Sequence, residues 1–334
     1  MSNLNIQDII QATNRISEIV KRTPVLSSSL LNQWLGHEIF FKAECMQKIG
    51  AFKARGACNT ISWLIENNQK PRHVVANSSG NHAQAVAWAA SQFGIPSTIY
   101  VPAGASKIKI QATKAYGAKV EICETRTLAD EKVKKAAEED GIYWVHPFNH
   151  EQVILGQGTA AYEALQELND IDAVFAPCGG GGLLSGTFIA SRGLAPKAAV
   201  IGAEPLSGND AVQSVRMNSI QKLSASPVTL ADGAMTLSVG NITFEYLKQL
   251  DNIYEINETE IIYWTQWLTH VLKTAVEPTS AMAMGAAQKW LRNQNSRKRV
   301  LIILSGGNID QETFLKIWNK NYMQFLPNLG RDFD

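Results

Sequence analysis

Apolar residues recur along the chain with two periods, one typical of amphipathic helices and the other of short buried strands. Residues 6–20 carry isoleucines and a valine at helical spacing, with polar residues between them. The same spacing predicts a second helix over 29–35, and a largely apolar run predicts a strand over 37–44. A third helix is expected to begin right after Arg55, so that Lys53 lies just before a helix N-terminus.

The segment 68–149 alternates between strands and helices with short connections. Its apolar runs HVVAN, STIYVP, AKVEIC and YWVHP are separated by helical patterns, which predicts parallel βαβ units. Helices and strands are also predicted before and after this block. We therefore expect an α/β fold with two open-sheet domains, in which a small mobile domain (68–149) is inserted into a larger one (1–67 and 150–334).

The second half of the chain continues the pattern of strands that end in turns. A helix over 159–168 is followed by the buried strand AVFAP, a run of glycines and the strand AVIGAE. Residues 207–238 are irregular and predict loops with one helix, whereas helical spacing returns over 260–272 and 280–291. The strand VLIIL over 300–304 and a short helix complete the expected elements.

The composition is that of a globular protein. Of the 334 residues, 45% are hydrophobic and 18% are charged, which excludes a disordered chain, and the formal net charge of +1 argues against a nucleic-acid partner. No apolar run approaches the roughly 20 residues of a membrane-spanning helix, and the N-terminus does not resemble a signal peptide. The four cysteines lack CxxC spacing, which is typical of a protein in a reducing compartment. We therefore expect a cytoplasmic protein, and the short apolar runs predict no membrane partner.

Lys53 is the first candidate for chemistry. It follows Ala51 and Phe52 and precedes Arg55 and Gly56 in the stretch KAECMQKIGAFKARG. Desolvation or a cationic neighbour favours the neutral form of a lysine amine, which can then form a Schiff base with a carbonyl group. Taken alone, such a lysine is more often a solvated surface residue.

The run CGGGGLLSG after the strand AVFAP is a candidate phosphate-binding loop. Consecutive glycines let the backbone approach an anion closely, with several N–H groups converging on it, although a tight turn without a ligand is the alternative. Neither GxGxxG nor GK[ST] fits the run, but Glu204, about 20 residues on, lies where a ribose-binding acid would lie. The glycines are Gly179, Gly180, Gly181 and Gly182.

Two further glycine turns follow apolar strands, SSGNHA at 78–83 and SGGNID at 305–310. Each places hydroxyl and amide groups at the C-terminal end of a strand, where open α/β sheets bind ligands. One such turn could be a plain connection. Three of them, together with a lysine before a helix, indicate a single site.

These motifs resemble those of a known family. KAECMQKIGAFKARGA, SSGNHAQA, PCGGGGLLSG, EPTSA and LSGGNID are similar, in order and spacing, to the motifs of the fold type II pyridoxal phosphate enzymes, above all the serine racemase and serine/threonine dehydratase branch. The resemblance spans Thr23 to about Asp310 and implies a fold like that of the tryptophan synthase β-subunit. Pyridoxal phosphate carries one aldehyde and one phosphate, which matches a lysine and a glycine loop.

The resemblance implies a role at the cofactor for each motif. Lys53 would form the Schiff base, Phe52 would pack near the ring, and Asn81 would bond to the ring hydroxyl. The loop from Gly179 to Gly182 would hold the phosphate, and Ser305 would face the pyridine nitrogen. A hydroxyl group does not force that nitrogen to stay protonated, which favours β-elimination over transamination.

The SSGNH loop is implied to bind the substrate. Ser78, Gly80 and His82 would hold the substrate carboxylate. Ser79 matches the serine that lies, in the racemases, on the ring face opposite the lysine, where racemisation needs a second proton relay. The alternatives are a helix-capping hydroxyl for Ser79 and a structural histidine for His82.

The segment EPLSGND resembles the divalent-cation site of this branch. Glu204, Asp210 and the backbone carbonyl of Gly208 would bind Mg²⁺, Ca²⁺ or Mn²⁺, because oxygen ligands suit hard cations. Two acids in a polar loop that are merely solvated are the alternative.

Two positions depart from the family pattern. Ala51 stands where most relatives carry serine, which removes one hydroxyl near the cofactor. Asp130 stands where the mammalian racemases place an arginine, and the nearest arginine is Arg126. We therefore expect the substrate carboxylate to be held differently on domain closure, which weakens the racemase interpretation.

We expect a lyase that dehydrates and deaminates L-serine or L-threonine to a 2-oxo acid and ammonia, and that forms a homodimer or homotetramer. The alternatives within the fold are a serine racemase with side elimination, a 3-hydroxyaspartate ammonia-lyase and a β-replacing synthase. The alternatives from other classes are a dinucleotide-binding oxidoreductase and a ligand-binding paralogue without catalysis. Because the chain ends soon after SGGNID, we expect no appended regulatory module.

Overall fold

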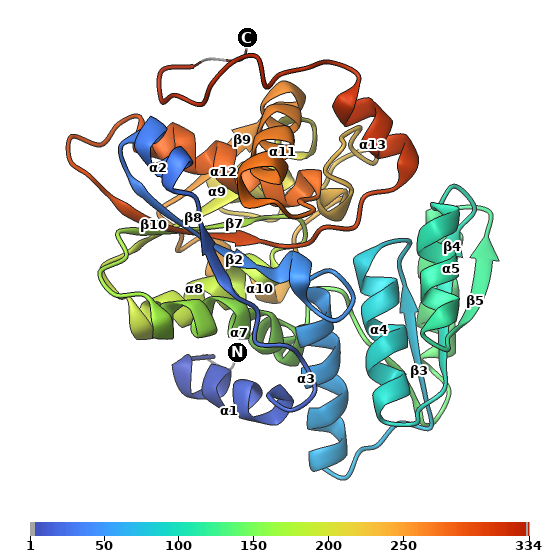
Figure 1. Cartoon of the computed structure of the whole chain (residues 1–334). Helices are drawn as coiled ribbons and strands as arrows, with labels where there is room; N and C mark the ends of the chain where they lie inside the picture. The colour runs from blue at the N-terminus through green and yellow to red at the C-terminus, as the bar shows by residue number, and fades with distance from the viewer. Residues whose placement is uncertain (1–3, 332, 334) are drawn as a thin grey trace.

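The computed structural model describes residues 4–331 and 333, and these residues form the α/β fold that the sequence predicts. Within the described part of the chain, a six-stranded sheet and a four-stranded sheet lie side by side (Figure 1). The four-stranded sheet is built from the middle of the N-terminal half, and the six-stranded sheet is built from the segments before and after it.

The larger sheet has the strand order β1-β2-β10-β7-β8-β9. Only the edge strand β1 is antiparallel to its neighbour, and the other pairs are parallel. The parallel strands are almost continuous apolar runs because helices cover both faces of the sheet. The strands are β1 Val25–Ser27, β2 Glu38–Ala43, β7 Ala173–Pro177, β8 Ala199–Pro205, β9 Asn252–Ile256 and β10 Arg299–Leu304.

Two groups of helices enclose this sheet (Figure 1). On one face α12 packs against the strands, with α11 and α2 in the same apolar core. On the other face α7 and α8 pack against the strands, and α1 lies outside them. The helices are α1 Ile6–Ile16, α2 Ser29–Leu35, α7 Glu151–Glu167, α8 Gly182–Leu194, α9 Asp210–Met217, α10 Asn241–Leu247, α11 Glu258–Leu272, α12 Pro278–Leu291 and α13 Gln311–Trp318.

The smaller sheet has the order β5-β4-β3-β6 with every pair parallel. Its strands fall inside the predicted small domain, 68–149, whose limits and mobility stay a prediction. Helix α3 stands between the two sheets and packs against α4 on one side and α7 on the other (Figure 1). These elements are α3 Lys53–Glu66, β3 His73–Asn77, α4 Asn81–Gln92, β4 Ser97–Pro102, α5 Lys107–Ala115, β5 Lys119–Cys123, α6 Arg126–Ala136 and β6 Ile142–Trp144.

The structure corrects several predicted boundaries. Helix α3 begins at Lys53 and not after Arg55, so the lysine is the first residue of the helix. Helix α7 begins at Glu151 instead of 159, although its first part contains two glycines. A Cβ on Gly156 would lie 2.6 Å from the Arg55 carbonyl oxygen, so close helix packing, and not helix propensity, requires glycine there. The short elements β1, β9 and α10 were not predicted.

A buried charge cluster fixes the first turn of α3. Arg55 is fully buried and donates to the Glu44 carboxylate (2.7 and 2.8 Å) and to the Glu163 carboxylate (2.6 and 2.8 Å). Lys42, also fully buried, donates to Glu163 at 2.6 Å. Burial works against the charged form of Glu163, but Arg55 and Lys42 hold its pKa below its usual range. The charges of the two cations and the two carboxylates therefore cancel. Their bonds tie α3 to β2, to α7 and to the segment after β2.

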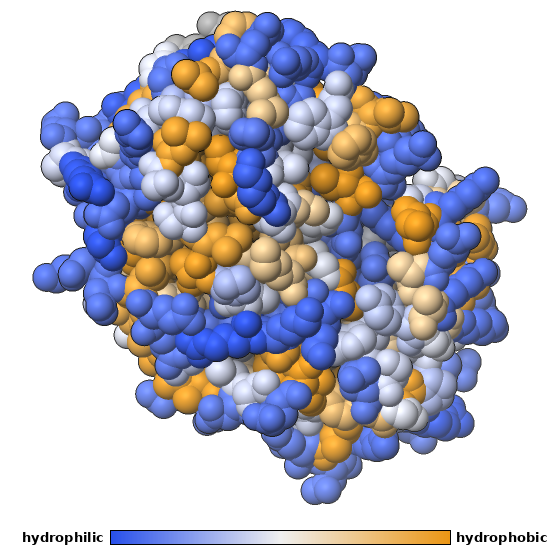
Figure 2. Space-filling view, in the orientation of Figure 1, coloured by the Kyte–Doolittle hydropathy of each residue, from blue (hydrophilic) through white to orange (hydrophobic). Residues whose placement is uncertain are grey.

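The surface mixes hydrophilic side chains with separate apolar patches (Figure 2). Several large apolar side chains of α13 and the segment after it are exposed, and Figure 2 shows orange patches in the region of α13. None of the described helices combines the length and the apolar character needed to cross a bilayer. The exposed apolar residues of this C-terminal region are Phe314, Leu315, Trp318, Phe325 and Leu326.

Replacing Arg55 with Met keeps an apolar stem of similar length but leaves Glu44 and Glu163 buried without their main partner. Breaking a buried pair in this way costs about 3–5 kcal/mol of unfolding free energy, and we expect urea unfolding followed by circular dichroism to show a loss of this size. The matched control is Lys316→Met, which breaks the exposed pair with Glu312 and should leave the midpoint unchanged. A wild-type midpoint for Arg55→Met would contradict the role given to the cluster.

Candidate functional site

A cavity of about 650 Å³ lies where strands of the two sheets end. Its walls come from residues that directly follow β3, β7 and β10, together with the start of α3. The carboxyl ends of parallel strands are where open α/β sheets bind ligands. The cavity brings together every predicted cofactor- and substrate-binding residue, namely Phe52, Lys53, Ser78, Ser79, Gly80, Asn81, His82, Gly179, Gly180, Gly181, Gly182 and Ser305.

Lys53 enters the cavity from the first turn of α3. Its Nζ donates to the Pro147 carbonyl oxygen at 2.6 Å and lies 5.1 Å from the centre of the Phe52 ring. Burial lowers the pKa of the Lys53 amine to about 7. A neutral amine is therefore accessible near neutral pH, as a lysine nucleophile requires.

The glycine loop between β7 and α8 is closely packed. A Cβ on Gly180 would lie 2.3 Å from the Phe148 ring, and a Cβ on Gly182 would lie 2.7 Å from Gln157 Oε1. Gly181, the residue before α8, has φ +92°, which favours glycine. The first N–H groups of α8 have no partner within the helix and lie at its positive end. The loop thus has the form and the donors of an anion site, and a phosphate group fits it.

The loop after β3 presents polar side chains to the cavity. Ser78 Oγ accepts a hydrogen bond from the Gly80 N–H at 3.2 Å, and Ser79 lines the cavity without being buried. His82 donates through Nε2 to the Val145 carbonyl oxygen at 2.8 Å. Burial and the nearby Lys53 lower the pKa of His82 to about 3, so its ring is neutral. Its Nε2 is therefore held by the backbone.

Ser305 closes the cavity from the end of β10. It is fully buried, and its hydroxyl oxygen lies 3.0 Å from that of Ser280 on α12. Its carbonyl oxygen accepts from the Phe52 N–H at 2.9 Å, and Ala51 and Gly306 form a backbone bridge. These bonds hold the lysine turn and the serine at a fixed separation.

Sequence reasoning missed several residues in the cavity walls. Glu277, directly before α12, is buried and accepts from Asn81. Asp232 forms an ion pair with Lys109 of α5, and Arg126 of α6 donates to the Met235 carbonyl oxygen at 2.7 Å. The EPTSA motif contains Glu277, and an acid between apolar residues at a helix start could have signalled it.

The proposed cation ligands lie outside this cavity. Glu204 is buried and accepts from the N–H groups of Ala211 and Val212 at 2.9 and 3.0 Å, so it caps α9, and it does not line the cavity. Both carboxylate oxygens of Asp210 are buried without a well-formed hydrogen bond among the described residues, although the backbone N–H groups of Asp210 and Val239 lie near enough to work against a rise in its pKa. Burial raises the pKa of Asp210 to about 7 and that of Glu204 well above its usual range, with Asp210 adding to the latter.

These two carboxylates fit a hard cation, which would supply the missing partner for Asp210. Gly208 lies in the turn between them. Within the described ranges 4–331 and 333, no group of three or more His, Cys, Asp or Glu side chains could hold a metal ion. Any cation here therefore needs backbone carbonyl or water oxygens in addition.

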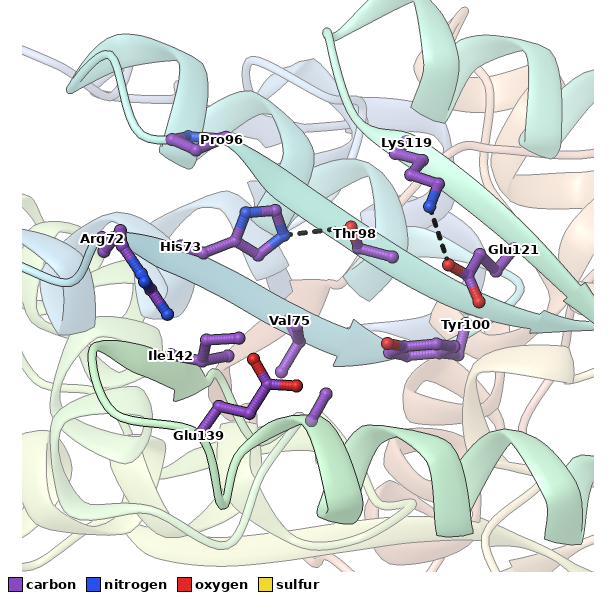
Figure 3. Close-up of a pocket in the computed structure, with 11 residues that line it drawn as sticks. Arg72, His73, Val75, Pro96, Thr98, Tyr100, Lys119, Glu121, Glu139 and Ile142 are labelled. Atoms are coloured by element: carbon purple, nitrogen blue, oxygen red, sulfur yellow. Dashed lines mark hydrogen bonds and ion pairs between the residues drawn. The ribbon is translucent and has the colours of Figure 1, made fainter.

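A second cavity, of about 380 Å³, lies on the smaller sheet at the start of its strands (Figure 3). Four of its polar side chains are bonded in two pairs. His73 bonds to Thr98 at 3.0 Å, and Lys119 pairs with Glu121 at 2.9 Å. None of the predicted site residues lines it, so the chemistry belongs to the larger cavity.

Comparison with known proteins tests the family resemblance that the sequence motifs indicate. The model of the family described as "Pyridoxal-phosphate dependent enzyme" matches residues 16–306. The chain is 42% identical over 310 residues to the L-threo-3-hydroxyaspartate ammonia-lyase of Saccharomyces cerevisiae, covering 92% of this chain and 94% of that one. It is also 42% identical over 309 residues to the serine racemase of Schizosaccharomyces pombe, covering 92% and 95%.

Solved structures of similar proteins superpose closely on this chain. The threonine deaminase of T.th. superposes with a TM-score of 0.86 at 38% identity, covering 92% of this chain and 99% of that one. The serine racemase of Dictyostelium discoideum superposes with a TM-score of 0.85 at 38% identity, covering 92% and 100%. The predicted family is therefore confirmed: this chain belongs to the pyridoxal-phosphate-dependent enzymes of fold type II.

Proposed function

We propose that this enzyme catalyses β-elimination of a β-hydroxy amino acid, L-serine or L-threonine, to a 2-oxo acid and ammonia. The observation that carries the proposal is the desolvated amine of Lys53, which shares one cavity with an anion-binding glycine loop and the Ser305 hydroxyl. The family assignment removes the dinucleotide-binding alternative, since Glu204 caps α9 and lies outside the cavity walls.

The residues of the cavity fit pyridoxal phosphate. The glycine loop would bind the phosphate, Lys53 would hold the aldehyde carbon, and Asn81 and Ser305 would contact the ring hydroxyl and the pyridine nitrogen. Phe52 would pack beside the ring. When bound, the cofactor supplies an electron sink for the charge that develops at the substrate Cα.

The protein supplies the proton transfers and the dry site. With its pKa near 7, the Lys53 amine can take the Cα proton at neutral pH and then return it. Ser78, Gly80 and the neutral His82 line the wall where the substrate carboxylate would lie. The Lys109–Asp232 pair joins the smaller sheet to the wall of the cavity and would exclude water while the β-hydroxyl leaves. The released enamine then hydrolyses to the 2-oxo acid and ammonia.

Serine racemisation is the second candidate, supported by Ser79. This hydroxyl lines the cavity and is partly exposed, so it is free to move a proton on a second face of the substrate. The serine racemase of Schizosaccharomyces pombe is 42% identical to this chain. Asp130 also lines the cavity. An arginine at this position, in addition to Arg126, would have strengthened the racemase candidate.

A substrate with a second carboxylate, 3-hydroxyaspartate, is the alternative that the charges of the cavity support. Arg126, Lys134 and Lys222 line it in addition to Lys53, and these four cations outnumber the three acids of its walls, Asp130, Asp232 and Glu277. The 3-hydroxyaspartate ammonia-lyases of Saccharomyces cerevisiae and Pseudomonas sp are 42% and 38% identical to this chain. Release of 2-oxo acid across serine, threonine and hydroxyaspartate stereoisomers separates the substrates.

We also propose a homodimer or homotetramer in the cytoplasm. The exposed apolar residues of α13 and the segment after it support self-association, because large apolar patches mark interaction surfaces. All four cysteines are unpaired, which supports a reducing compartment.

Replacing Lys53 with Ala should abolish both turnover and the visible absorbance of bound pyridoxal phosphate, because the amine is the covalent partner and the base. In the wild type, cofactor uptake by the cofactor-free protein should quicken as the pH rises through about 7, since the neutral amine then dominates. Lys48→Ala, at an exposed lysine of the same stretch, is the control and should behave like the wild type. Residual turnover or colour in Lys53→Ala would refute the assignment.

Replacing Ser79 with Ala tests the second candidate. If Ser79 relays the second proton, D-serine formation should fall by about 10²-fold or more while 2-oxo acid release from L-serine is kept, because removing a positioned acid or base typically costs that factor. Chiral chromatography and a keto-acid assay measure the two rates. An equal loss of both rates, or of neither, would argue that this hydroxyl only caps or lines the loop.

The cation proposal predicts that chelation destabilises the protein. A free cation concentration of 100 times the dissociation constant adds about 2.7 kcal/mol, so EDTA should lower the Tm by about 4 °C, and Mg²⁺, Ca²⁺ or Mn²⁺ should restore it. Asp210→Asn should make the Tm insensitive to EDTA. Asp251→Asn, at a carboxylate paired with Arg192 on the surface, should keep the sensitivity of the wild type. An unchanged wild-type Tm in EDTA would exclude a structural cation.

A further inference from the structure

We propose that Glu277 and Asn308 are positioning residues that fix the side-chain amide of Asn81, so that one of its N–H donors faces the cavity. The inference rests on the proposed function, since it concerns how the protein presents a donor to the cofactor's ring hydroxyl. Neither residue touches the reacting atoms. Their effect passes through Asn81, which lines the cavity.

Three separate segments meet at this amide. Asn81 Nδ2 donates to Glu277 Oε1 and Oε2 at 3.2 and 3.1 Å, and Asn81 Oδ1 accepts from Asn308 Nδ2 at 2.8 Å. The Asn308 N–H donates to Glu277 Oε2 at 3.2 Å. Asn81 follows β3 of the smaller sheet, Glu277 precedes α12, and Asn308 follows β10. The amide is therefore held from both ends, by an acceptor and by a donor.

An asparagine amide has two faces of nearly equal shape, and its hydrogen-bond partners decide which way it points. If the Asn81 amide turned over, its oxygen would meet the Glu277 carboxylate and its NH₂ would meet the NH₂ of Asn308. Both contacts are repulsive. With the observed orientation, one Nδ2 proton is shared between the Glu277 oxygens and the other is left for an acceptor in the cavity.

Asn308 is itself fixed by its surroundings. Its Nδ2 also donates to the Ile49 carbonyl oxygen at 2.8 Å, so its oxygen and nitrogen cannot exchange without losing two bonds. A Cβ on Gly50 would lie 2.7 Å from Asn308 Oδ1, and a Cβ on Gly306 would lie 2.6 Å from Glu277 Oε2. A residue larger than glycine at either position would therefore push these two partners away from Asn81.

Glu277 has an unusual charge environment for an acceptor. Burial and the nearby Asp232 raise its pKa to about 7, while its bonds from Asn81 and Asn308 and the charge of Lys109 favour the carboxylate. Lys109 and Asp232 are paired with each other, so neither of them pairs fully with Glu277. Above pH 7 Glu277 is a carboxylate that accepts bonds only, which is why it orients the amide.

The test is Glu277→Gln, studied without substrate. The glutamine amide puts an NH₂ group against either Asn81 or the Asn308 N–H, so the Asn81 amide is no longer forced into one orientation. We expect pyridoxal phosphate to bind the cofactor-free protein about tenfold more weakly, since one charge-assisted hydrogen bond is lost. The visible absorbance of the bound cofactor should also shift to shorter wavelength, because a donor no longer stabilises the ionised ring hydroxyl.

The matched control is Glu260→Gln. Glu260 is equally buried at the start of α11, accepts from the Asn257 N–H and from Lys289 at 2.9 Å, and lies outside the cavity walls. Its replacement should change the Tm of the cofactor-free protein without changing cofactor affinity or absorbance. If cofactor affinity and absorbance changed in both Glu277→Gln and Glu260→Gln, the cause would be a general loss of stability, and the proposal would be overturned.

A second variant keeps the test decisive if Glu277→Gln does not fold. Asn308→Ala removes the donor to Asn81 Oδ1 and keeps Glu277, so we expect the same spectral shift and a weaker affinity by about threefold. Wild-type affinity and absorbance in whichever of the two variants folds would overturn the inference and leave the proposed function standing. Failure of the wild type to bind pyridoxal phosphate would instead refute the proposed function itself.

Discussion

The pairing of Arg55 with Glu44 and Glu163 is the interaction on which the site depends. Arg55 lies two residues after Lys53, in the first turn of α3, and its guanidinium binds carboxylates from two other segments at 2.6–2.8 Å. A buried cation costs much desolvation energy unless it is paired, so the helix start has one stable position. The backbone of Lys53 is therefore held in place by the ion pairs of Arg55, and only its side chain is left free to change position.

The two sheets then bring the remaining groups to this lysine. Three walls of the cavity are turns at the carboxyl ends of strands, and these strands belong to both sheets. The glycine loop, our proposed phosphate site, belongs to the larger sheet, and Asn81 follows a strand of the smaller one. Close glycine contacts, such as that of Gly180 with the Phe148 ring, set the spacing of these turns. The proposed anion site of the glycine loop and the hydrogen bonds of the Asn81 amide thus depend on how the two sheets are placed relative to each other.

Much of this arrangement could be read from the sequence. Alternating apolar runs predicted the parallel strands, and the turns SSGNH, CGGGG and SGGN correctly indicated one shared cavity. The early start of α7 was missed because Gly156 and Gly158 resemble loop residues, whereas they permit contact with α3 and α8. Glu277 was given no role because its function depends on Asn81, which is distant in the sequence. Periodicity reports local structure, but it carries no information about which distant polar groups meet.

The contacts of α5 and α6 with the 232–235 segment affect how ligands reach and leave the cavity. Across the seam between the sheets, an ion pair from Lys109 and a hydrogen bond from Arg126 reach this segment, whereas α3 and α4 pack tightly along their lengths. Partly exposed ion pairs contribute little free energy and are screened by salt. We expect the seam to part on the polar side and to pivot on the helical side. Higher ionic strength would then speed the entry of ligands into the cavity and their release.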